Sequence, residues 1–485
     1  MAANTLTLSL WYSSVRQRTF TQVALLTGYF LLGAGTAAFF FVAFARVWGK
    51  RHLFILGSII LIFSSAWAGA SGKNYRSMLW ARIFQGIGAA PYETLLNATV
   101  GDLYFVHQRG KRMAITNLAV FGGAFMTPVL VGKITHSIGW QWTFYLEAIF
   151  CAACLPAIIF LVPETAYRRS ATLNTDLHTD SDDTLRARLE SRTAHGNQDE
   201  KAPLPNGNGS LSLSQHNNHN PSSEENLANG QTSPTGTTPK KSYAQTLKPF
   251  SGWYTEDNFF KILLRPLPLF LHPAILWGCL IQGSMIGWTV FIGVDLAAIM
   301  LGPPLWWGEV ETGYAYVGAF IGAILGFLVA GGLADWSAKA MTKRNGGVYE
   351  PEFRIVLVIP MLIFGCAGLY GFGVTSNNLY KYHWIWPVFF FGLEVMGMVI
   401  GAVASSLYIV DAHRDISVEA FTCLIMFKNF LSFFLTFFAY EWLVRFGVWD
   451  TFMVISSLQV GICFLSVPMC RSPKKSLDRL LESWC

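Results

Sequence analysis

Long uninterrupted apolar runs recur along the chain and constrain its fold more than any other feature. A helix needs about 20 such residues to cross the roughly 30 Å hydrocarbon core of a bilayer. Because the runs are continuous and do not alternate with polar residues, they predict helices and not barrel strands. The predicted spans cover residues 20–44, 52–70, 78–99, 113–134, 142–162, 272–300, 312–333, 353–374, 383–410, 418–440 and 448–467. The expected fold class is therefore an all-α integral membrane protein with about 11 transmembrane helices.

The composition agrees with a membrane protein and argues against several other classes. Of 485 residues, 52% are hydrophobic and only 13% are charged, whereas soluble domains carry about a quarter charged residues. The net charge of +6 is spread over loops, without the basic patch that a nucleic-acid partner requires. The eight cysteines form no paired framework with histidine, so we expect no metal site. We find no nucleophile elbow or phosphate-binding lysine motif, and we therefore expect neither an enzyme nor a cofactor.

One polar stretch divides the apolar runs into two sets. Residues 164–256 are rich in Ser, Asn, Thr, Gly, Pro and mixed charges. Such a composition buries too little apolar surface to offset the entropy of ordering the chain. We therefore predict a first half of five spans at 1–163, a disordered linker at 164–256, a second half of six spans at 257–470 and a tail at 471–485.

Loop charges predict the orientation of the bundle. Lys and Arg concentrate in every second loop, and the positive-inside rule places those loops, the linker and the tail in the cytoplasm. Eleven spans then put Met1 outside, against the positive flank of Arg16 and Arg18 just before the first span. After the linker, the stretch KILLRPLPLF resembles an amphipathic segment that lies at the membrane surface.

Several motifs resemble those of fungal transporters. RIFQGIGAAP at residues 82–91 resembles the fourth-helix signature of the major facilitator superfamily, and GGLADWSAKAMTKRNGGVYEPEFR at 331–354 resembles its loop between helices eight and nine. NATVGDLYFVHQRGKRMA, GGAFMTPVLVGKI, GWQWTFY, VPETAYRR and YIVDAHRDISVEAF are similar to the drug:proton antiporter-like branch of the same fungal families. The resemblance implies two helical bundles around a central cavity, built from inverted repeats.

The resemblance also implies a function and partners. It predicts a secondary active transporter, expected to export a small organic molecule in exchange for protons. The alternatives are a proton-coupled importer of a nutrient or cationic metabolite, and a non-transporting truncated form. We expect a monomer in the plasma membrane, with the vacuolar membrane as the alternative, whose partners are a small-molecule substrate, protons and the lipid bilayer.

The sequence departs from the family pattern in two places. The family's loop between helices two and three falls at residues 45–52, so we expect the first family helix to be missing. The acidic motif D-R-x-G-R of that loop reads ARVWGKR here, with Arg46 in the Asp position. In the second half Asp335, four residues after Gly331, keeps the acid. We therefore expect a gating loop formed by Gly331, Asp335 and Arg344.

Ionisable side chains inside spans cost several kcal/mol and mark candidate functional residues. Arg82, Gly86, Glu93 and Asn97 follow one another by 4, 7 and 4 residues, which places them on one helical face. Burial favours the neutral form of a carboxyl and a nearby cation favours the charged form, so we predict that Glu93, with Arg82, couples protons to transport. The alternative is a permanent structural ion pair of Glu93. The resemblance marks Arg82 and Gln85 as signature residues.

Further polar residues inside spans predict a substrate cavity. The predicted cavity residues are Gln85, Asn97, Gln282, Glu394, Lys428 and Asn429. Lys428 and Glu394 allow two interpretations, either an ion pair between two helices or contacts to the substrate. We expect Asp295 to reach water near the end of its span. Three glycines at 318, 322 and 326 lie on one stripe and predict close helix packing.

Overall fold

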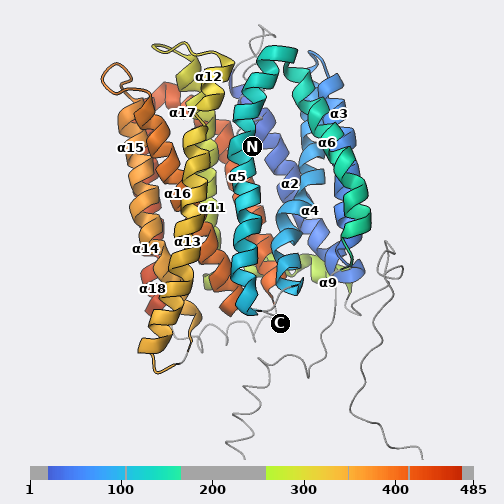
Figure 1. Ribbon diagram of the computed structural model, residues 1–485, viewed down its shortest axis with the longest axis vertical. Coiled ribbons are helices and arrows are strands. Elements are labelled where there is room, and N and C mark those ends of the chain that lie inside the picture. The colour runs from blue at the N-terminus through green and yellow to red at the C-terminus, as the bar shows by residue number, and fades with distance from the viewer. Residues whose placement is uncertain (1–19, 104–105, 165–257, 348, 413–415, 472–485) are drawn as a thin grey trace, which may run out of the picture. The chain divides into compact units, whose positions relative to one another are not determined.

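The computed structural model describes residues 20–103, 106–164, 258–347, 349–412 and 416–471. The first half contains five long helices, shown from blue to green in Figure 1. They are α2 (Phe20–Trp48), α3 (Arg51–Ala70), α4 (Tyr75–Leu103), α5 (Val106–Ile138) and α6 (Trp140–Leu161). The apolar runs form these helices because a helix satisfies all its backbone hydrogen bonds internally. Gly49, with φ of 95°, makes the turn between α2 and α3.

The second half begins with two short helices and continues with long ones. They are α9 (Phe259–Leu264), α10 (Pro266–Leu269), α11 (Pro273–Leu301), α12 (Glu309–Tyr314), α13 (Val317–Arg344), α16 (Ile385–Ala412), α17 (Ser417–Phe464) and α18 (Ser466–Arg471). Between α13 and α16, one span is built from η2 (Pro351–Leu357), α14 (Val358–Met361), η3 (Leu362–Cys366) and α15 (Ala367–Ser376). The described residues contain no β-strand.

The helices coincide with the predicted spans. Nine helical segments among the described residues are long and apolar enough to cross a membrane. The 29-residue α4 is also of membrane length, although charged side chains make it less apolar. Gly447 has non-helical φ and ψ of 80° and 166°, so α17 is two helices. With α4 included and α17 divided, the described chain has the eleven helices predicted.

The predicted linker lies outside the described residues except for Glu164, and so do residues 1–19 and 472–485. The predictions about the linker, the tail and the side of Met1 therefore stay predictions. The described chain breaks off at Glu164 and resumes at Asn258, and we call the end of the bundle where these residues lie the linker end.

Glycines allow helices within each half to approach one another closely. A Cβ on Gly86 of α4 would lie 2.0 Å from the Phe30 carbonyl oxygen of α2. In the second half, a Cβ on Gly322 of α13 would lie 2.0 Å from the Gly392 carbonyl oxygen of α16. These distances leave no room for a side chain, which confirms the close packing predicted for the glycine stripe.

The halves meet along two seams. At one seam α2 packs against α17, and at the other α5 packs against α13 and α12. Figure 1 shows α5 and α13 running side by side along the bundle. Large apolar side chains such as Phe63 and Phe150, which are 71% and 70% exposed, lie on the outer surface, as lipid-facing side chains do. The space between the seams holds the candidate site.

Candidate functional site

A cavity of about 250 Å³ lies between the two halves and is lined by α2, α4, α5, α11, α16 and α17. Most of its wall is apolar, including the rings of Phe30, Phe121 and Phe125. The charged side chains that line it are Glu93 and Lys428. A largely apolar wall with a few polar groups is typical of small-molecule sites.

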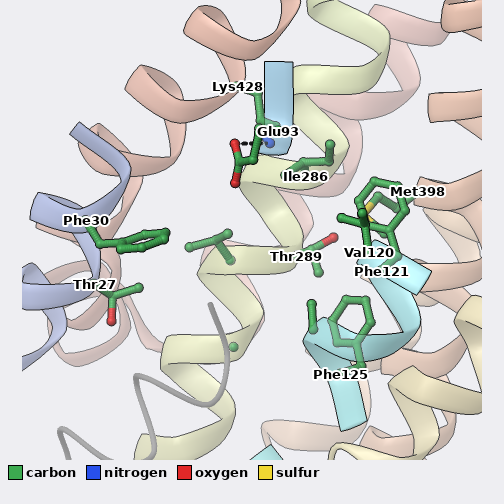
Figure 2. A pocket seen from close by; sticks show the side chains of 13 residues that line it. Thr27, Phe30, Glu93, Val120, Phe121, Phe125, Ile286, Thr289, Met398 and Lys428 are labelled. Atoms are coloured by element: carbon green, nitrogen blue, oxygen red, sulfur yellow. Dashed lines mark hydrogen bonds and ion pairs between the residues drawn. The ribbon is translucent and has the colours of Figure 1, made fainter. Parts of the chain in front are cut away.

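The two charged residues of the cavity form an ion pair between the halves (Figure 2). Lys428 Nζ on α17 lies 2.9 Å from Glu93 Oε2 on α4. The side-chain amide of Asn429 donates a second hydrogen bond, of 3.2 Å, to the same oxygen. The Lys428 and Glu93 side chains are 12% and 18% exposed, so this contact is screened much less than a surface pair. The structure therefore brings three predicted site residues together at one carboxylate.

Glu394 is not the partner of Lys428, which corrects one of the two interpretations of the sequence. It is fully buried on α16, and its Oε1 accepts a 2.8 Å hydrogen bond from the Thr289 hydroxyl of α11. Thr289 itself lines the cavity. A single hydrogen bond, from Thr289, therefore connects Glu394 to the wall of the cavity. Gln282, seven residues before Thr289 on α11, accepts a 3.2 Å hydrogen bond from the Ser405 hydroxyl of α16.

Arg82 and Gln85 belong to a second polar cluster inside the first half. Arg82 Nη1 donates to Gln85 Oε1 at 2.5 Å, and Gln85 Nε2 donates to Glu147 Oε2 of α6 at 2.6 Å. Arg82 is fully buried and lies over the Phe30 ring, 5.1 Å from its centroid. Phe30 also lines the cavity, so one ring separates this cluster from the central site.

The second cluster separates Arg82 from Glu93 and contains an acid that the sequence analysis did not single out. Arg82 shares a helical face with Glu93 but contacts different partners, because 11 residues of helix separate them by about 16 Å. Glu147 was missed by the sequence reasoning, although an acid inside the predicted span 142–162 is the same signal that identified Glu93. Asn97 lies in α4, and its side chain is outside the described set.

A third cluster joins the halves at the linker end. Arg46 Nη2 of α2 lies 2.5 Å from Glu419 Oε2 of α17, and Arg265 Nη1 lies 3.7 Å from the other oxygen of the same carboxylate. Glu419 is fully buried. Arg46, which stands in the position of the family's acid, thus forms an ion pair with Glu419 across the α2–α17 seam. Neither Glu419 nor Arg265 was singled out from the sequence.

The predicted gating loop and Asp295 lie apart from these clusters. Asp335 and Arg344 are exposed at the end of α13, and a Cβ on Gly331 would meet no atom within 4 Å. Asp295 does not reach water as expected but is fully buried, because α11 packs against both α16 and α17.

Near the gating loop, Arg354 Nε lies 3.1 Å from Asp411 Oδ2, and the Tyr349 hydroxyl donates to the same carboxylate oxygen. Burial, followed by the charge of Asp411, raises the pKa of Tyr349 above its usual value.

Membrane-length helices in two groups around a central cavity, joined across it by a charge pair, define a polytopic membrane protein of the transporter class. The model of the Major Facilitator Superfamily matches residues 1–416, and the chain belongs to this family. It is therefore a multi-pass membrane protein and a secondary transporter, and the expectation that it is not an enzyme is confirmed, because members of this family are transporters.

Relatives and solved structures agree with this assignment. The chain is 24% identical over 460 residues to Protein HOL1 of Saccharomyces cerevisiae, covering 91% of this chain and 78% of HOL1. It is 25% identical over 405 residues to the major facilitator superfamily multidrug transporter FLU1 of Candida albicans, covering 81% and 55% of the two chains. The fold resembles that of the xylose transporter XylE from E. coli, with a TM-score of 0.53, 14% identity and coverage of 96% and 93%.

Proposed function

We propose that this protein exports a small organic molecule by proton-coupled alternating access, with Glu93 as the group that carries the coupling proton. The observation that carries the proposal is the Glu93–Lys428 pair, because it lines the cavity and also connects the two halves. A titratable contact between moving bodies can couple a proton to their movement, since protonation removes the charge that holds them together.

The proposed step needs only a proton and a change of partner. A proton from cavity water binds Glu93 Oε2 and makes the carboxyl neutral. Lys428 then loses its counter-charge, which weakens the contact between α4 and α17 and favours separation of the halves at that level. Release of the proton restores the carboxylate, and the 2.9 Å pair forms again. The neutral carboxyl, the ammonium group and the surrounding aromatic rings are available to the substrate only in the separated state.

Direction, membrane and orientation belong to the same proposal. FLU1 is named a multidrug transporter, which supports export, and we propose the plasma membrane with the linker end in the cytoplasm. The alternatives are a proton-coupled importer of a nutrient or cationic metabolite, a vacuolar location, and a non-transporting form that lacks the first family helix.

Transport is tested by accumulation of ethidium, an aromatic cation that suits a cavity lined by phenyl rings. Cells that express the protein should accumulate less ethidium than control cells, and a protonophore should abolish the difference. Glu93→Gln should remove the protonophore-sensitive part when transport is normalised to the amount of protein in the membrane, while Glu311→Gln, an exposed glutamate of α12, should not. Higher accumulation in expressing cells would indicate import.

A second test needs no substrate. Nitroxide labels at Ile115 of α5 and Lys339 of α13, both exposed near the linker end, report the separation of the halves. We expect acidification to redistribute the distances and Glu93→Gln to give the acid distribution at every pH. A pH response that is unchanged in Glu93→Gln would exclude Glu93 as the coupling group.

A further inference from the structure

The α9–α10 segment has an apolar outer face in addition to the face that it buries. Asn258 caps α9 by accepting a hydrogen bond from the Phe260 backbone N–H. On the inner face, Ile262 and Leu263 are buried against Ala43 and Val47 of α2. The outer face carries four large apolar side chains, which are 68%, 53%, 47% and 75% exposed: Phe260, Leu264, Leu267 and Leu271.

The inner contacts show where this outer face lies relative to the bundle. The Phe259 ring lies 6.1 Å from that of Trp48, the last residue of α2, whereas Phe270 packs against the cluster of Ala38, Ile425 and Met426. The segment therefore crosses the seam, with α9 against α2 and α10 against α17. Because these helices span the membrane and the segment lies near their linker ends, we expect its exposed apolar face to lie at the membrane interface.

The positive charge of the segment favours a membrane surface that contains anionic lipids. Between Asn258 and His272 the chain contains Lys261 and Arg265 and no acidic residue. Lys261 is exposed beside Phe260. Basic side chains that flank an apolar face are attracted to the phosphates of anionic lipids while the apolar side chains enter the acyl region.

Arg265 links this surface to the contact between the halves. Its guanidinium lies 3.7 Å from Glu419 Oε1, and Arg46 of the first half holds Glu419 Oε2 at 2.5 Å. Because Glu419 is fully buried, the two guanidinium groups offset the cost of taking its carboxylate out of water. A displacement of the segment would remove one of them.

We propose that the α9–α10 segment binds the anionic lipid leaflet at the linker end, and that this attachment strengthens the Arg46–Glu419 contact between the halves. The lipid thereby favours the state in which the linker end is closed. The inference rests on the alternating access of the proposed function but uses neither its substrate nor its proton. Its tests therefore distinguish its failure from a failure of Glu93 coupling.

The first experiment tests the lipid contact in full-length protein reconstituted in nanodiscs. A nitroxide on Leu264→Cys, with accessible native cysteines replaced, should collide with oxygen more often than with a water-soluble nickel chelate. A nitroxide on Tyr380→Cys, a position 86% exposed between α15 and α16, should show the opposite preference. Preferential collision of the Leu264 label with nickel would overturn the proposal.

The second experiment tests the effect on closure of the linker end. With labels at Ile115 and Lys339, nanodiscs of phosphatidylcholine are compared with nanodiscs that also contain phosphatidylserine. We expect the ratio of closed to open distances to be about fivefold higher with the anionic lipid, within the usual range of coupling between sites. Leu264→Gln and Arg265→Gln should each abolish this difference, although the Arg265→Gln segment should still contact lipid in the collision assay.

Ile359→Gln is the matched control, because Ile359 is 58% exposed on α14, away from this seam. It should keep the full dependence on phosphatidylserine. Equal closed fractions in the two lipids for the unsubstituted protein, or a dependence that survives both Leu264→Gln and Arg265→Gln, would refute the proposed role of the segment.

Discussion

Replacing Glu93 and Lys428 singly and together should show that they act as one unit. Lys428→Met leaves the Glu93 carboxylate with only the amide of Asn429, and Glu93→Gln leaves a mostly buried ammonium without an anion. The double substitution removes both charges and leaves neither unpaired. We therefore expect the double variant to be more stable than the sum of the single effects predicts.

The distance between the Lys428 and Glu93 charges and the exposure of the two side chains set the expected losses of stability. At 2.9 Å the gross attraction of two unit charges is about 6 kcal/mol in an effective dielectric of about 20. Most of it is offset by the desolvation of both groups. We expect Lys428→Met to cost about 3 kcal/mol, because breaking a buried pair leaves a charge uncompensated. Glu93→Gln should cost about 2 kcal/mol, because its amide oxygen can still accept a hydrogen bond.

The quantity to measure is the coupling free energy between the two substitutions. Subtracting the two single effects from the double effect cancels the losses that each substitution causes by itself. We expect about 1–3 kcal/mol from the double-mutant cycle. Tryptophan fluorescence melts of the purified protein at one scan rate supply the apparent stabilities. Each kcal/mol shifts the midpoint by no more than about 2–4 °C in a protein of this size, so all four proteins must be compared in one detergent. Strictly additive losses would refute the assignment of the pair as an energetic link between the halves.

Three further predictions concern the packing and the buried acids. Gly322→Ala should lower the melting temperature by an amount equivalent to about 2 kcal/mol or more, because its Cβ would meet the backbone of α16 at 2.0 Å, whereas Gly332→Ala has no neighbour within 4 Å and should leave the melt unchanged. Glu394→Gln, which keeps an acceptor for the cavity threonine, should cost about 1 kcal/mol, and Glu394→Ala, which leaves a void, about 2–4 kcal/mol in the same melts. The raised pKa of Tyr349 means that its contact with Asp411 is fully present below about pH 10 and is lost as pH rises through the folded pKa. Tyr349→Phe should therefore remove the part of the stability loss that sets in above about pH 10 in denaturant titrations, and an unchanged loss would exclude Tyr349 as its source.

The sequence alone determined the helices and one close helix contact within the second half. A backbone in lipid must satisfy its own hydrogen bonds, so apolar runs of membrane length become helices with few alternatives. This physical constraint is why the eleven predicted spans coincide with the helices found. The stripe of glycines on α13 was also readable, because the 3.6-residue period places positions four apart on one face.

The tertiary structure decided which charged residues form ion pairs with each other. Helical periodicity shows which residues share a face, but it does not specify how two helices distant in sequence are rotated and offset against each other. Lys428 could therefore be assigned to Glu394 or to a substrate, and only the packing of α17 against the first half brings it to Glu93. The same limit hid the acid that holds Arg46, because Glu419 lies 373 residues away along the chain. Ion pairs between the two halves depend on how the halves pack against each other, and that packing depends on whole helix surfaces and not on the spacing of residues within one helix.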